Sequence, residues 1–136
     1  MALEGWIVDT SAFHRLRASP DYPTWKNRIS RGLVGVSSVT LLEVGFSARN
    51  SRDYTETRNS VLIDHLELLS ITCDVEKAAL GIQMKLAEVS MHRGPSVADI
   101  LVAAIALRLN KTVLHCDKDF EAIHAVTGQK VEWIST

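Results

Sequence analysis

The stretch 96–107 constrains the fold more than any other, because it combines an apolar helical run with one acid near its start. Residues 100–107 are all apolar, so a helix here is buried over most of its surface. Asp99 lies on that helix, and a carboxylate on a buried helix is costly unless a positive group meets it. Ser96 and Asp99 also have the spacing of a capping box, which puts both at the helix start. No Lys or Arg stands beside Asp99 in the sequence, so its partner has to come from elsewhere in the fold.

The rest of the chain alternates short apolar runs with helical stretches. The apolar runs predict strands at 6–8, 33–37, 68–72, 112–115 and 130–134. Apolar periodicity and capping residues predict helices at 10–16, 20–31, 40–50, 53–66, 74–89, 96–110 and 117–125. Strands separated by helices predict an α/β fold, a three-layer α/β/α sandwich around a mainly parallel sheet of four or five strands. The length of 136 residues suits a single domain over 1–136.

Four acids are expected at one edge of that sheet. Asp9 follows the first strand and Asp117 follows the fourth. Glu43 and Asp99 stand in the first turns of helices, Glu43 at the capping-box spacing from Thr40. In open parallel sheets, sites lie outside the carboxyl ends of the strands. We therefore expect these four carboxylates to point into one cleft.

Each acid has a purely local explanation as a helix cap or a turn residue, favoured by the helix dipole. What indicates a functional site is that the four carboxylates are expected to lie close together. Two carboxylates about 4 Å apart repel by ~4 kcal/mol at an effective dielectric constant of 20. Carboxylate oxygens are hard ligands, so a cluster without a basic partner predicts a site for Mg²⁺ or Mn²⁺.

Composition excludes some other classes of function. A net charge of −1 gives no bulk signal for nucleic-acid binding, which would need a local basic patch. The two cysteines are far apart in sequence and suggest neither a disulfide framework nor a metal knuckle, which favours a reducing cytoplasm. The longest apolar run, 100–107, is too short to span a membrane. Residues 1–5 lack the basic start of a signal peptide, so no leader is expected.

Four segments, in order, resemble the PIN-domain family, and more closely the VapC toxins of bacterial type II toxin–antitoxin pairs. They are Ile7-Val8-Asp9-Thr10-Ser11-Ala12, Thr40-Leu41-Leu42-Glu43, Ala98-Asp99-Ile100-Leu101-Val102-Ala103-Ala104-Ile105-Ala106 and Cys116-Asp117-Lys118-Asp119-Phe120-Glu121-Ala122-Ile123. The resemblance covers nearly the whole chain. It implies an α/β/α sandwich, Mg²⁺-dependent ribonuclease activity, an inhibiting VapB-like antitoxin and a homodimer.

The resemblance also assigns roles to residues. It implies a catalytic and metal-binding quartet of Asp9, Glu43, Asp99 and Asp117. Ser11 matches a supporting hydroxyl position, and Asp119 an additional acid; of Asp117 and Asp119, we favour Asp117 as the fourth ligand. His115-Cys116 departs from the Thr-Arg type pair that the family often has, which argues against a role for a basic residue there but not against the metal site.

The substrate side is less defined. A basic group soon after Asp9 could contact RNA phosphates or an antitoxin, or could simply be a solvated helix face. Its members are Arg15, Arg17, Lys26 and Arg28. Packing is the favoured role for His115, at a strand end, and core packing for the aromatic residues Trp6, Phe46 and Trp133.

Three other readings compete with a nuclease. A PIN fold kept only for protein contacts would not need an intact quartet. A receiver-like phosphoacceptor domain would need paired acids after the first strand and an acceptor Asp directly after the third, where this chain has Ile71-Thr72-Cys73-Asp74. A haloacid-dehalogenase-type phosphatase would need Asp-x-Asp after the first strand, and Asp9-Thr10-Ser11 does not supply it.

Overall fold

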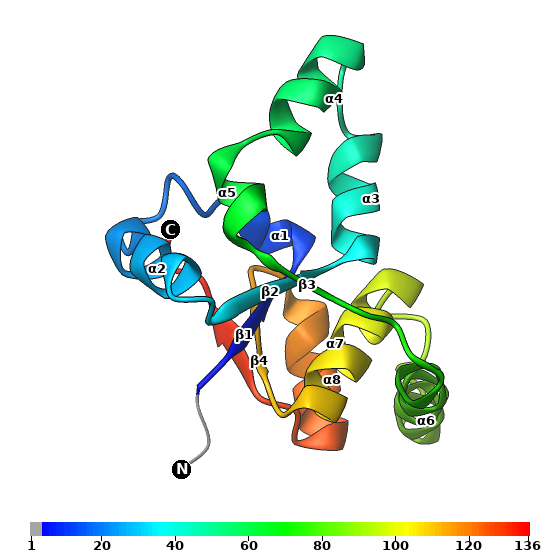
Figure 1. The fold of residues 1–136 in the computed structure, drawn as a ribbon. Helices are drawn as coiled ribbons and strands as arrows, with labels where there is room; N and C mark the ends of the chain where they lie inside the picture. The colour runs from blue at the N-terminus through cyan, green and yellow to red at the C-terminus, as the bar shows by residue number, and fades with distance from the viewer. Residues whose placement is uncertain (1–3) are drawn as a thin grey trace.

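The computed structural model describes residues 4–136, which form a five-stranded parallel sheet with helices on both faces (Figure 1). The strands are β1 (Trp6–Val8), β2 (Val34–Ser37), β3 (Glu67–Leu69), β4 (Thr112–His115) and β5 (Val131–Trp133). They lie in the order β3-β2-β1-β4-β5. The predicted α/β/α sandwich is confirmed. The expectation of no leader falls partly on residues 1–3, which lie outside the described residues.

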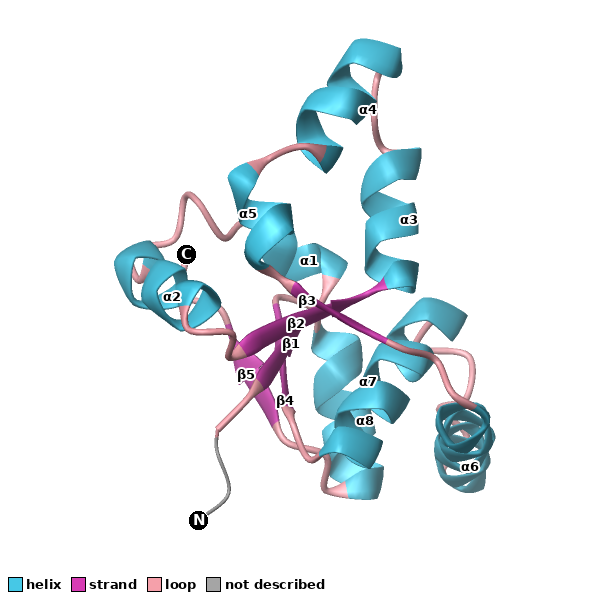
Figure 2. Cartoon of the chain, in the orientation of Figure 1, coloured by secondary structure: helices cyan, strands magenta, loops and turns pink. Residues whose placement is uncertain are grey.

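Helices cover both faces of the sheet (Figure 2). Their bounds are α1 (Thr10–Phe13), α2 (Tyr22–Ser30), α3 (Ser38–Phe46), α4 (Ser51–Arg58), α5 (Val61–His65), α6 (Cys73–Glu88), α7 (Val97–Leu109) and α8 (Lys118–Thr127). One apolar core packs α6, α7 and α8 against the sheet, and a second packs α1, α2 and α5 against its other face. In residues 4–136, no helix is long and apolar enough to cross a bilayer.

The central strands alternate between the two cores residue by residue. Ile7 and Val113 contribute to the core on the α7 side, whereas Val8 and Leu114 contribute to the core on the α1 side. All four side chains are inaccessible to solvent. Burial on both faces explains why these strands read as continuous apolar runs in the sequence.

The order of the strands creates a switch point between β1 and β4. After β1 the chain moves to β2 and β3 on one side, and it then crosses to β4 and β5 on the other. In such sheets, the crevice beyond the carboxyl ends of the two strands at the switch is the usual ligand site. Val8 pairs with Leu114 at this end, and the main-chain N–H of Asp9 donates to the Leu114 carbonyl oxygen at 2.9 Å. The strand ends therefore bring the segments after β1 and β4 together.

The predicted helix over 53–66 is wrong, because it is two helices. It is divided between Arg58 and Val61, where the Ser60 side chain accepts from the Ile63 N–H and starts α5. Asn50 was expected to end the preceding helix, but it caps the start of α4 by accepting from the Asp53 N–H.

The prediction that three aromatic residues pack in the core is wrong for two of them. Trp6 is buried, but Phe46 is 93% exposed and Trp133 is 48% exposed. Phe46 is the last residue of α3, and Trp133 lies on the edge strand β5. Apolar character in the sequence does not distinguish a core position from an uncovered end or edge.

Candidate metal centre

Asp9 begins the site at the carboxyl end of β1. It is the N-cap of α1 and is 3% exposed. Its Oδ2 accepts two hydrogen bonds from Ser11, one from the main-chain N–H at 3.0 Å and one from the hydroxyl at 2.7 Å. The carboxylate is therefore held in one orientation at the start of the helix.

Ser11 links Asp9 to the turn after β4. Its Oγ donates to Asp9 and also accepts from the main-chain N–H of Cys116 at 2.9 Å. One hydroxyl thus joins the first acid to the segment that carries Asp117. This geometry agrees with a supporting role for Ser11.

The predicted capping box of Thr40 and Glu43 is wrong. Ser37 is the N-cap of α3, and its hydroxyl accepts from the Thr40 N–H at 3.2 Å. Glu43 therefore lies in the second turn of α3. Its Oε1 accepts from the Thr10 hydroxyl at 2.6 Å, so a residue adjacent to Asp9 in sequence holds Glu43 in place. The sequence did not identify Thr10, because its partner lies 33 positions away.

The capping box at the start of α7 is confirmed. The Ser96 hydroxyl accepts from the Asp99 N–H at 3.1 Å, and Asp99 Oδ2 accepts from the Ser96 N–H at 2.9 Å. Asp99 is only 8% exposed. The carboxylate is therefore fixed by one oxygen to its own helix start.

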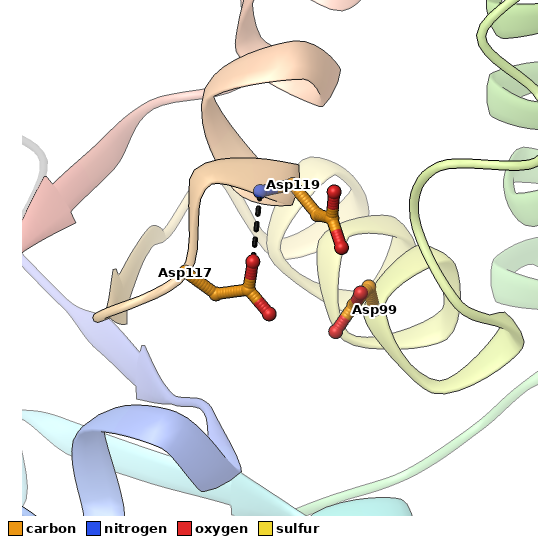
Figure 3. Close-up of side chains that lie close together, drawn as sticks. All are labelled: Asp99, Asp117 and Asp119. Atoms are coloured by element: carbon orange, nitrogen blue, oxygen red, sulfur yellow. Dashed lines mark hydrogen bonds between the residues drawn. The ribbon is translucent and has the colours of Figure 1, made fainter.

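The side chains of Asp117 and Asp119 lie close to that of Asp99 (Figure 3). Asp117 is the N-cap of α8, and its Oδ1 accepts from the Asp119 N–H at 2.9 Å. Each of the three acids offers an oxygen within 4.8 Å of the other two. Oxygens that share one Mg²⁺ at about 2.1 Å lie no more than about 4.2 Å apart, so a small side-chain movement suffices for them to bind the same ion.

Electrostatics connects all four predicted acids. Burial, with smaller contributions from the charges of Asp9 and Asp117, raises the pKa of Asp99 to about 6, although the hydrogen bonds from Ser96 act to lower it. Burial is also the main cause of the raised pKa of Asp9, to which the charge of Glu43 adds. Each acid therefore destabilises the ionised form of a neighbour.

The described residues supply no basic partner to this group of acids. Over residues 4–136, the side-chain ion pairs involve other acids, namely Asp53, Glu56, Asp74 and Glu121. A group of carboxylates without a basic partner, in which burial raises the pKa of Asp9 and Asp99, fits a hard divalent ion such as Mg²⁺ or Mn²⁺. Among the predicted residues, Asp99 and Asp117 lie together with Asp119, whereas Asp9 and Glu43 border this group.

The basic residues predicted to contact RNA or a partner lie in different places. The exposed Arg15 donates to the Ser11 carbonyl oxygen at 3.1 Å, close to Asp9. Arg17 and Lys26 line a cavity of about 490 Å³. Arg28 instead stacks on Trp6 and Trp25, 4.5 Å from each ring centre. Trp6 opens β1, so Arg28 lies toward the edge of the sheet opposite the acids.

Comparison with known proteins identifies relatives along nearly the whole chain. The family model described as "PIN domain" matches residues 6–126. The chain is 46% identical over 132 residues to ribonuclease VapC2 of Mycobacterium tuberculosis CDC 1551 / Oshkosh, covering 97% of this chain and 94% of the relative. It is 38% identical over 134 residues to ribonuclease VapC51 of M. tuberculosis H37Rv, covering 98% and 95%.

Solved structures share the fold at low sequence identity. VapBC2 of Rickettsia felis, bound to a promoter DNA fragment, contains a chain that matches with a TM-score of 0.76 at 13% identity, covering 94% of this chain and 97% of that one. DNA-bound VapBC of Salmonella typhimurium matches with a TM-score of 0.75 at 19% identity, covering 96% and 98%. These likenesses establish the arrangement of the strands and helices.

Proposed function

Because the chain belongs to the PIN-domain family, we propose that it is a divalent-metal-dependent endoribonuclease, the toxin of a VapBC-type toxin–antitoxin pair, acting as one domain over residues 1–136 in the cytoplasm. The observation that carries the proposal is the meeting of Asp99, Asp117 and Asp119 beyond the ends of β1 and β4. The chain matches its curated relatives over nearly their full length, and these relatives are named ribonucleases, which supports the reaction class.

The acids divide the work according to their contacts. Asp99 and Asp117 would hold the metal, together with Asp9, whose carboxylate Ser11 orients. Asp119 adds an oxygen to the same group. A divalent ion held there would polarise the scissile phosphate and lower the pKa of a water bound to it.

Glu43 stands at the border of this group, on a different helix. Its link to Thr10 keeps its carboxylate beside Asp9 and exposed enough to reach a water or a phosphate-bound ion. Arg15, on the rim next to Asp9, supplies a cation for an RNA phosphate. Arg28 is excluded from this surface by its stacking on two tryptophans.

The partner is proposed to be a VapB-like antitoxin, because neighbours in structure are VapBC complexes. Two cavities that share Arg17 and Leu62 are lined by residues from α1, α2, α3, α4 and α5. The second cavity combines apolar lining with Arg17 and Lys26, which suits an amphipathic segment that carries acidic residues. We place the antitoxin segment on this surface.

A homodimer is proposed through α3. Leu42 and Phe46 stand four positions apart on this helix and are 72% and 93% exposed. Adjacent large apolar side chains at helical spacing form a face that water solvates poorly, and a second copy would cover it. Sedimentation of the wild type and of Phe46→Glu tests this, since the substitution should shift the protein toward monomer.

The decisive experiment is cleavage of total small RNA by the purified full chain, freed of any partner, with Mg²⁺, with Mn²⁺ and with a chelator. Asp99→Asn is tested in parallel, and Asp74→Asn is the matched control. Asp74 also lies in the first turn of a helix, but it is exposed and pairs with Arg108. Metal-dependent cutting that Asp99→Asn abolishes and Asp74→Asn retains is expected. A folded protein that binds metal but cuts no RNA would favour the binding-module alternative.

A further inference from the structure

His115 is a completely buried polar side chain at the end of β4 that the proposed reaction does not yet use. Its Nδ1 lies 3.1 Å from the main-chain nitrogen of Asp117 and accepts that N–H. An imidazole nitrogen that accepts a hydrogen bond carries no proton, so the ring is neutral with its hydrogen on Nε2. Burial, the main influence, lowers the pKa of His115 and favours this neutral form.

Neighbouring side chains hold the ring of His115 in place. The Phe120 and Trp133 rings lie 5.2 Å and 4.7 Å from it, centre to centre. Its Nε2 lies 3.3 Å from Glu121 Oε1 but forms no hydrogen bond with a described residue. A ring packed in this way keeps Nδ1 directed at the Asp117 N–H. A buried polar side chain that is held so closely needs a reason to be polar.

The turn after β4 is fixed at two successive amides. The Cys116 N–H donates to the Ser11 hydroxyl, and the Asp117 N–H donates to His115 Nδ1. Ser11 in turn contacts Asp9, so the first contact ties the turn to the opening acid of the site. The second contact fixes the main chain of the residue that carries the Asp117 carboxylate. A turn held at only one of these amides can rotate, and the carboxylate rotates with it.

We propose that His115 is a positioning residue that holds the Asp117 main chain so that the carboxylates of Asp117 and Asp119 face Asp99. The proposal rests on the proposed function, because it concerns the same metal centre. Removal of an outer hydrogen-bonding partner of a metal site typically costs 10–100-fold in metal affinity or activity. His115 fits that description through a main-chain contact rather than through a ligand side chain.

Two substitutions test the proposal, because they place the same amide group at different distances from the main chain. The oxygen of His115→Asn can occupy the place of Nδ1 and accept the Asp117 N–H. His115→Gln carries the same amide one methylene further, toward the place of Nε2. We expect Asn to keep Mg²⁺ affinity and kcat within about threefold of wild type, and Gln and His115→Leu to lose about 10–100-fold in Mg²⁺ affinity. His124→Leu is the control, because it removes an exposed histidine from α8.

The measurements are Mg²⁺ binding by calorimetry, Mn²⁺ binding by electron paramagnetic resonance, and RNA cleavage as a function of Mg²⁺ concentration, all on the full chain. Circular dichroism establishes that each variant is folded. If the Asn and Gln variants bind Mg²⁺ equally well, the proposal is overturned, whether or not His115→Leu folds. A wild type that binds metal but cuts no RNA refutes the proposed function alone, since metal affinity still reports on His115. A wild type that binds no divalent metal refutes both.

Discussion

Replacing Asp99 by Asn should stabilise the metal-free protein near neutral pH. Asp99 is 8% exposed, and burial with the charges of Asp9 and Asp117 raises its pKa from 3.8 to about 6. The ionised carboxylate therefore has a higher free energy in the native state than in the unfolded chain. The amide of Asn removes this charge and still offers an oxygen to the Ser96 N–H, which Asp99 binds at 2.9 Å.

The pKa sets the size and the sign of the effect. Between pH 3.8 and about 6 the native state binds more protons at Asp99 than the unfolded state does, so the free energy of unfolding falls as pH rises. Above pH 6 the loss is complete and corresponds to about 3 kcal/mol. The neutral amide oxygen of Asn accepts the Ser96 N–H less strongly than a carboxylate does, which offsets part of this, so the expected gain is about 1–3 kcal/mol at pH 8. Near pH 4 the gain should shrink towards zero.

Urea unfolding with a chelator at pH 4 and pH 8 measures this directly, with Asp74→Asn as the control. Adding Mg²⁺ at pH 8 should reverse the order, because an ion that binds only the native state stabilises the wild type and has lost a ligand in Asp99→Asn. A variant that is less stable than the wild type at pH 8 without metal would refute the reasoning. It would mean that the Asp99 carboxylate is stabilised by its surroundings rather than strained by them.

Other predictions follow from the same geometry. Metal affinity should fall as pH falls through about 6, because Asp99 then takes up a proton. Calorimetry at pH 5.5, 6.5 and 7.5 measures this, and the same dissociation constant for the metal at all three pH values would contradict it. Thr10→Val should lower cleavage about tenfold by freeing Glu43, while Thr10→Ser keeps the hydroxyl and the rate. Ile105→Ala should cost about 2–5 kcal/mol in urea unfolding, because Ile105 is fully buried. Phe46→Ser should change stability by less than about 0.5 kcal/mol in the monomer, since the ring is exposed; a larger loss would place it in a core.

Local patterns predicted the elements that depend on neighbouring residues. The strands at 6–8 and 112–115 were found because residues buried on both faces read as continuous apolar runs. The start of α7 was found because Ser96 and Asp99 form a capping box within one turn. The start of α3 was misplaced because Ser37 and Thr40 are both good caps, and only the end of β2 selects Ser37.

The amino-acid sequence was enough to predict a parallel α/β fold and to place Asp9 and Asp117 after strands and Asp99 at a helix start. Burial pattern, helix caps and residue order are local properties, and they are readable without coordinates. The tertiary structure decided which acids meet. Strand order puts β1 beside β4, so Asp9 and Asp117 follow neighbouring strands at the same end of the sheet although 108 positions separate them in the chain. Likewise, Thr10 reaches Glu43, and His115 holds Asp117, only because packing aligns α1 with α3 and presses β5 and α8 around the imidazole.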